Sequence, residues 1–223
     1  MSPIRSLSVR HAVVAGVMAL ATLASLVAAG PACAADASSF QSAFQTFSQA
    51  SSGDKSAIDP AADAFEALLK AEPANPVLMA YAGASTALKA QNTAMPWKKM
   101  GFAEDGLAQV DKALAMLTPA HDAPVQHGTP GALEVRFVAA TTYLAMPSFM
   151  NRAERGAKLL GEVLASPLFE RAPLPFKGAV WMRAAALAAK DQRKDDARRY
   201  FNEVIEHAAP QAEAARAKLK EIA

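Results

Sequence analysis

Two histidines and an aspartate come closest to a metal site in this sequence. His121, Asp122 and His127 lie in a segment, residues 120–131, that is rich in proline and glycine. Imidazole nitrogens and carboxylate oxygens are ligands that transition metals bind in proteins. The two histidines are not one helical turn apart, however, and no cysteine lies near them. The spacing predicts a solvated connection without a metal or cofactor, and an enzyme with its site in residues 120–131 is kept as an alternative.

The sequence shows neither a serine nucleophile with its supporting residues nor a carboxylate pair placed for acid–base catalysis. Ser148 follows a proline, but it has neither the flanking glycines of a nucleophile elbow nor a histidine nearby in the sequence. The carboxylate pairs Asp63 with Glu66 and Asp195 with Asp196 fall at helix positions expected to face water. The sequence therefore predicts no catalytic residues and a protein that is not an enzyme.

Aromatic, sulfur-containing and basic residues gather in two segments, 95–100 and 146–152. Tryptophan and arginine are enriched at binding hot spots, and methionine and phenylalanine supply adaptable apolar area. If neighbouring helices bring these segments together, they form a groove with an apolar floor and a basic rim. The predicted binding residues of that groove are Trp97, Lys98, Lys99, Arg136, Phe149 and Arg152. In the alternative interpretation, Trp97, Phe149 and the methionines fill the core where the helix pattern is irregular.

A second surface, residues 190–199, is strongly charged. Asp195 precedes Arg198 and Arg199 at the three- and four-residue spacing that stabilises a helix by a few tenths of a kcal/mol. This pattern predicts a solvated helix face. An interaction face for a charged partner is the alternative.

The N-terminal segment has the pattern of a secretory signal peptide. Arg5 and Arg10 precede an almost continuously apolar stretch, residues 12–29, and small residues flank position 33. We therefore expect a signal peptide over residues 1–34, a mature domain over 35–223, and export to the periplasm or the exterior.

Two alternatives remain for that segment. It could be retained as an inner-membrane anchor, because residues 12–29 approach the 17 to 25 or so apolar residues that span a bilayer. Cys33 could also carry a lipid, although the residues before it depart from the lipoprotein pattern.

Charge and cysteine content exclude two classes of function. Of 23 basic residues, Arg5 and Arg10 belong to the predicted signal peptide, so 21 remain against 21 acidic residues and the mature net charge is zero. A neutral domain has no overall electrostatic attraction to nucleic acid or anionic lipid. The chain has one cysteine, Cys33, so its removal with the signal peptide excludes thiol chemistry.

Apolar residues recur at three- and four-residue spacing throughout the mature chain, and no stretch alternates long enough to form a strand. This pattern predicts an all-α fold. After a first helix that contains Phe40, Phe44 and Phe47, the expected helices are residues 60–71, 77–90, 100–117, 132–145, 151–164, 177–189, 191–208 and 211–222.

Two stretches, residues 55–90 and 177–210, share a pattern of small, aromatic and proline residues. Their shared residues are Ala61, Phe65, Leu68, Pro73 and Gly83 in the first, and Trp181, Ala197, Phe201 and Pro210 in the second. The pattern resembles the tetratricopeptide repeat (TPR), a unit of about 34 residues. In such repeats a small residue, here Gly83, lets neighbouring helices approach closely.

The resemblance implies stacked antiparallel helix pairs that form a short superhelix. It also implies an interaction module that holds a protein or peptide partner in the cell envelope without catalysis. We expect no nucleic-acid partner, and membrane contact only through the N-terminal segment if that segment is retained. A carrier with an apolar pocket between helices is the alternative function.

Overall fold

The computed structural model describes residues 30–222, so most of the predicted signal segment lies outside the described part. The described backbone is helical and contains no strand, which confirms the all-α prediction. None of its helices is long and apolar enough to cross a membrane. The helices are α1 (Gly30–Ser51), α2 (Ile58–Ala71), α3 (Pro76–Leu88), α4 (Pro96–Ala115), α5 (Gly131–Ala145), α6 (Ala153–Ala165), α7 (Leu174–Lys190), α8 (Lys194–Glu206) and α9 (Ala212–Glu221).

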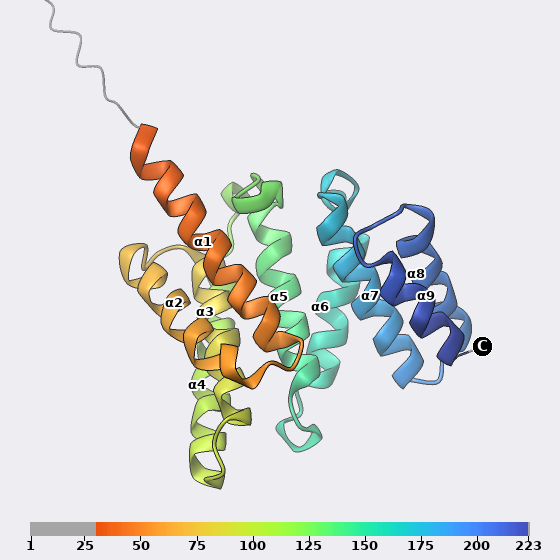
Figure 1. The fold of residues 1–223 in the computed structure, drawn as a ribbon, viewed down its shortest axis with the longest axis horizontal. Coiled ribbons are helices and arrows are strands. Elements are labelled where there is room, and N and C mark those ends of the chain that lie inside the picture. The colour runs from red at the N-terminus through yellow and green to blue at the C-terminus, as the bar shows by residue number, and fades with distance from the viewer. Residues whose placement is uncertain (1–29, 223) are drawn as a thin grey trace, which may run out of the picture.

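Helices that follow one another in the chain pack against one another. The most extensive contacts join α3 to α4, α5 to α6 and α7 to α8, while α2 lies against both α1 and α3. Figure 1 shows these helices side by side in chain order, from α1 to α4 at one side of the molecule to α7, α8 and α9 at the other. Within each of the three pairs the helices run in opposite directions, whereas α1, α5 and α7 run in the same direction.

Helices α3 and α4 cross in close contact through two glycines. A Cβ atom added to Gly83 would lie 2.7 Å from the carbonyl oxygen of Gly106, and a Cβ added to Gly106 would lie 2.5 Å from that of Gly83. Any side chain at either position would therefore push the two helices apart. The expected role of Gly83 is confirmed, and Gly106 is its partner.

Two helices begin earlier than the sequence pattern predicts. α4 begins at Pro96 rather than near Met100, and α7 begins at Leu174 with Pro175 in its first turn. A proline fits the first turn of a helix because the N–H groups there have no partner within the helix. The expected loop 91–99 is therefore shorter, and Trp97, Lys98 and Lys99 belong to the first turn of α4.

An aromatic cluster fills the core of the N-terminal half. The ring of Phe65 is fully buried and stacks on Tyr81 with a centroid distance of 4.8 Å, while Phe40 meets Tyr81 edge-on at 5.7 Å. In the C-terminal half Trp181 is buried against Phe169 at 5.8 Å. The large aromatic residues of both repeat-like stretches thus lie in the core.

Candidate functional site

Four residues of the two Met-rich and aromatic segments are exposed. Trp97 is 70% exposed, Phe149 64%, Met95 44% and Met100 37%, and they are the exposed large hydrophobic residues of the described chain. The interpretation that these side chains fill the core is therefore wrong. Their side chains are available for contact with a partner.

Two of the six predicted binding residues meet in a shallow hollow between α4 and the turn that follows α5. Phe149 and Arg152 line this hollow of about 380 Å³ together with Met100 and Met150. Asp111 of α4 organises its wall. Its carboxylate accepts hydrogen bonds from the Tyr143 hydroxyl at 2.5 Å, from Arg152 at 3.4 Å and from Arg155. The sequence pattern did not single out Asp111, because nothing along the chain connects it to these partners.

The other four predicted residues do not join that hollow. Lys98 and Lys99 are exposed beside Trp97, and neither lysine makes an ion pair or hydrogen bond within the described residues. Arg136 lies elsewhere on α5, where its guanidinium donates to the Ala132 carbonyl oxygen at 3.3 Å. Of the six residues predicted to form one groove, this hollow thus brings together only Phe149 and Arg152.

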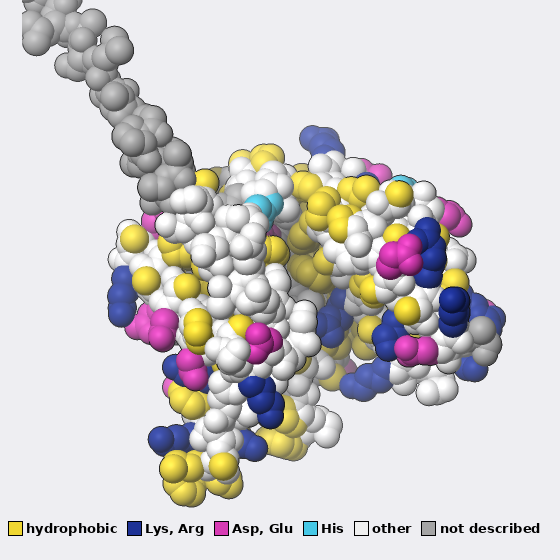
Figure 2. Space-filling view, viewed as in Figure 1, with side chains coloured by type: hydrophobic (Ala, Val, Ile, Leu, Met, Phe, Trp, Pro, Cys, Tyr) yellow, Lys and Arg dark blue, Asp and Glu magenta, His cyan; other side chains and the backbone are white. Residues whose placement is uncertain are grey.

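A larger groove lies between α1, α5 and α7, and the sequence pattern did not reveal it. Its volume is about 780 Å³. Figure 2 shows the surface hollowed between α1 and α7, with hydrophobic side chains on its walls. The large apolar residues that line it are Phe44, Phe47, Phe137, Val138, Phe176 and Met182. With the smaller and polar residues of the lining, such as Glu134, Thr141, Ala179 and Ala186, they follow the helical spacing of three or four positions, which is the one trace of the groove in the sequence.

Glu134 contributes a buried carboxyl group to this groove. Its side chain is 3% exposed, and its Oε1 accepts a hydrogen bond from the Tyr81 hydroxyl at 2.9 Å. Its Oε2 has no hydrogen-bond partner among the described residues. Burial raises the pKa of Glu134 to about 7, so the group titrates near neutral pH. Glu134 and Gln211 thus each bring to the groove lining a buried oxygen atom that has no hydrogen-bond partner among the described residues.

Arg183 contributes a cation from the opposite wall. The side chain lines the groove, and no anion or hydrogen-bond acceptor contacts its guanidinium within residues 30–222. Burial lowers the pKa of Arg183, because the charged form loses part of its hydration. A partly desolvated cation without an anion is unfavourable. A ligand carboxylate would supply the missing partner.

The two histidines of the segment 120–131 have different neighbours. His121 bonds the main-chain N–H of Thr118 at 3.0 Å. His127, at one end of the groove, contacts the side-chain oxygen of Gln41, and its ring lies 5.1 Å from Phe40 and 4.9 Å from Phe44. Within the described residues no group of three or more potential ligands is placed to hold a metal ion. The neighbours of His127 are an amide and two phenyl rings. None of these groups gives up or takes up a proton near neutral pH, so the contacts of His127 do not support a role in proton transfer.

The charged face at residues 190–199 carries five basic residues and three aspartates, and its arginines pair with the aspartates. Arg193 forms ion pairs with Asp191 at 3.3 Å and with Asp196 at 2.7 Å, and Arg199 also pairs with Asp196, at 3.1 Å. These exposed pairs contribute little to stability. Lys190 and Lys194 have no ion-pair partner among the described residues, so this face keeps positive charge and the interaction-face alternative stays a prediction.

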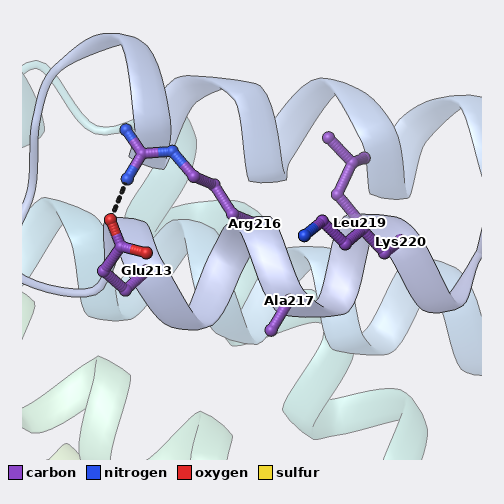
Figure 3. Close-up of a pocket in the computed structure, with 5 residues that line it drawn as sticks. All are labelled: Glu213, Arg216, Ala217, Leu219 and Lys220. Atoms are coloured by element: carbon purple, nitrogen blue, oxygen red, sulfur yellow. Dashed lines mark hydrogen bonds and ion pairs between the residues drawn. The ribbon is translucent and has the colours of Figure 1, made fainter.

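The C-terminal helix carries a further hollow of about 430 Å³ (Figure 3). It is lined by Glu213, Arg216, Ala217, Leu219 and Lys220. All five residues belong to α9, and Arg216 pairs with Glu213 one turn away. Because one helix supplies every group, nothing converges on a ligand there.

Comparisons with known proteins identify no relative: no protein-family model, curated protein or solved structure matches the chain. What the protein binds must therefore be inferred from its own geometry. Two surfaces stand out, namely the groove between α1, α5 and α7 and the exposed apolar residues at the start of α4.

Proposed function

We propose that the protein is an exported, TPR-like interaction module that binds an extended segment of a partner protein in the cell envelope, without catalysis. The binding site is the groove between α1, α5 and α7. One observation carries the proposal: this open apolar groove contains a cation, Arg183, without an anion, and a buried carboxyl oxygen of Glu134 without a donor. The antiparallel pairs α3–α4, α5–α6 and α7–α8, with α1, α5 and α7 running in one direction, support the repeat form.

The dimensions of the groove favour a peptide. Its lining residues on α1 extend from Gln41 to Ser51, which is about 15 Å along a helix at 1.5 Å per residue. An extended chain advances about 3.3 Å per residue, so a segment of about five residues would fill this length. The hollow visible in Figure 2 is open to the surface, so that a longer chain could continue beyond it.

The chemistry of the walls specifies the segment. Aromatic walls such as Phe137 and Phe176, whose rings meet edge-on at 5.4 Å, would receive apolar side chains. A carboxylate of the segment would pair with Arg183, which lines the groove and has no anion among the described residues. The preferred ligand is therefore an apolar segment that carries an acidic group.

A carrier of a small apolar molecule is the second candidate. The groove volume of about 780 Å³ lies within the range of about 300 to 1,000 Å³ that small-molecule sites occupy. The opening to the surface and the two unsatisfied polar groups favour the peptide.

Immobilised synthetic peptides would test the proposal. Short apolar peptides with one Asp or Glu are compared with the same peptides carrying Lys at that position. We expect the protein to bind the acidic peptides, and Arg183→Gln to weaken this binding tenfold or more. Arg136→Gln is the matched control, because Arg136 lies outside the groove.

Two outcomes would contradict the proposal. Either no peptide binds, or the acidic peptides bind Arg183→Gln as tightly as the unmodified protein. Binding of a fluorescent fatty acid in the absence of any peptide binding would favour the carrier instead.

A further inference from the structure

The exposed large hydrophobic residues of the described chain lie at one end of the molecule. Met95, Trp97 and Met100 belong to the start of α4, and Phe149 belongs to the turn between α5 and α6. Figure 1 shows that the start of α4 and this turn reach the same, lower end. In Figure 2 hydrophobic side chains gather at the tip of that end, with lysine or arginine side chains beside them. We call these four residues the apolar tip.

Regular structure holds the apolar tip in place. The glycine crossing between Gly83 and Gly106 fixes α4 against α3, so the first turn of α4 projects from a rigid base. The turn that carries Phe149 ends at Asn151 in a left-handed conformation, with φ of 53°, and Arg152 next to it is held by Asp111. The exposure of these side chains therefore follows from the fold.

Unpaired positive charge accompanies the apolar tip. Lys98 and Lys99 follow Trp97 in the first turn of α4, which contains no acidic residue. Cations are unfavourable at a helix N-terminus, because the helix dipole places partial positive charge there. The first acidic residue of α4 is Glu104, and neither lysine has an ion-pair partner within the described part of the chain. An anionic partner would pair with the two lysines and would also offset their unfavourable position at the helix N-terminus.

The shape of the tip distinguishes between anionic partners. A protein partner would need a pocket shaped to receive such exposed side chains, and Figure 2 shows hydrophobic side chains gathered at the tip of the lower end of the molecule. A bilayer surface yields to a protruding group: tryptophan prefers the headgroup region, apolar side chains enter the acyl boundary, and lysines pair with anionic headgroups. This combination matches the apolar tip residue by residue.

We propose that the apolar tip docks the protein on the surface of an anionic phospholipid bilayer, with Trp97 at the interface and Lys98 and Lys99 against the headgroups. This contact is additional to any made by the N-terminal segment, through which alone the sequence pattern predicted membrane contact. It is also independent of the groove, whose lining includes none of these residues.

Tryptophan fluorescence of the full chain tests the proposal, because it reports on the tip even if the N-terminal segment inserts by itself. The probes are vesicles of phosphatidylcholine alone and vesicles that also contain phosphatidylglycerol, each with and without brominated acyl chains. We expect anionic vesicles to shift the emission to shorter wavelength, and bromine to quench it. Trp97→Phe should abolish both changes, because Trp181, the other tryptophan, is buried.

Charge variants test the headgroup contact. Each lysine near an anionic surface contributes about a fivefold gain in partitioning, so Lys98→Gln with Lys99→Gln should weaken the response about thirtyfold. The matched control, Lys194→Gln with Lys220→Gln, removes the same charge from exposed positions on α8 and α9. Circular dichroism should be unchanged in both, because all four side chains are exposed. Thermal melting should show no loss of stability in either, and Lys98→Gln with Lys99→Gln should melt slightly higher because it removes cations from a helix N-terminus.

Three results would overturn the proposal. They are an unshifted Trp97 emission on anionic vesicles, an equal shift on phosphatidylcholine alone, and a response to soluble polyglutamate without a response to vesicles. The last result would assign the tip to an acidic protein partner.

Discussion

The Tyr81 hydroxyl donates a hydrogen bond to Oε1 of Glu134 across 2.9 Å, and this contact joins the aromatic core of the N-terminal half to the floor of the groove. The two residues are 53 positions apart in the chain. The carboxyl group is held in place by the core, while its second oxygen is buried without a hydrogen-bond partner among the described residues. The side chain of Glu134 therefore both contacts the core and lines the proposed binding groove.

The buried carboxyl group makes stability depend on pH. The pKa of Glu134 rises from 4.5 to about 7 on folding because of burial, so the folded state holds this proton more tightly. The contribution of Glu134 to the free energy of unfolding is fully present below pH 4.5 and is lost as the pH rises through 7. With about 1.4 kcal/mol per pKa unit, the loss is on the order of 3 kcal/mol. Urea unfolding at pH 5 and pH 8 should show this loss, and Glu134→Gln should remove it.

The comparison with Glu134→Gln is needed because His127 acts in the opposite direction. Burial lowers the pKa of His127, so its contribution to stability is lost as pH falls. The difference between the wild-type and variant profiles isolates Glu134. Identical pH profiles for the two proteins would show that the carboxyl group is not buried as described.

The glycine crossing predicts opposite effects for two similar substitutions. Gly106→Ala should destabilise the protein by about 1 to 3 kcal/mol, because its Cβ would lie 2.5 Å from a backbone oxygen of α3. Gly161→Ala in α6 meets nothing within 4 Å, so it should stabilise by about 0.5 to 1 kcal/mol. Denaturant unfolding measures both. If the two variants were equally stable, the close contact between α3 and α4 would be disproved.

Two phenylalanines should also differ. Phe65 is 0% exposed and stacks on Tyr81, so Phe65→Ala should lower the free energy of unfolding by about 3 to 5 kcal/mol. Phe149 is 64% exposed, so Phe149→Ala should change it by less than about 0.5 kcal/mol. A large loss in Phe149→Ala would mean that the apolar tip belongs to the core.

Export can be checked directly. The basic residues, the apolar stretch 12–29 and the small residues around position 33 predict that the mature protein begins at Ala35. N-terminal sequencing of protein recovered from the cell envelope should show this start. A full-length chain embedded in the membrane would instead support a retained anchor.

The periodic spacing of apolar residues was sufficient to predict the helices, and the repeat-like pattern correctly identified Phe65 as buried and Gly83 as a close-contact residue. Neither could predict the groove, because its walls come from α1, α5 and α7, which are distant in sequence. A helical pattern indicates which residues share a face, but not which helix lies opposite. The sequence also left open whether Trp97 is exposed or buried, because a tryptophan between methionines is typical both of a core and of a binding surface.

Photo-crosslinking from the two walls of the groove tests the central claim most directly. A photoreactive amino acid replaces Phe47 on α1 or Met182 on α7, and a third variant carries it at Arg136, outside the groove. Each variant is irradiated with an acidic apolar peptide that binds the unmodified protein. The account predicts crosslinks to the same peptide from positions 47 and 182 and none from position 136. Crosslinks from position 136 alone, or from none of the three positions while the peptide is bound, would contradict it.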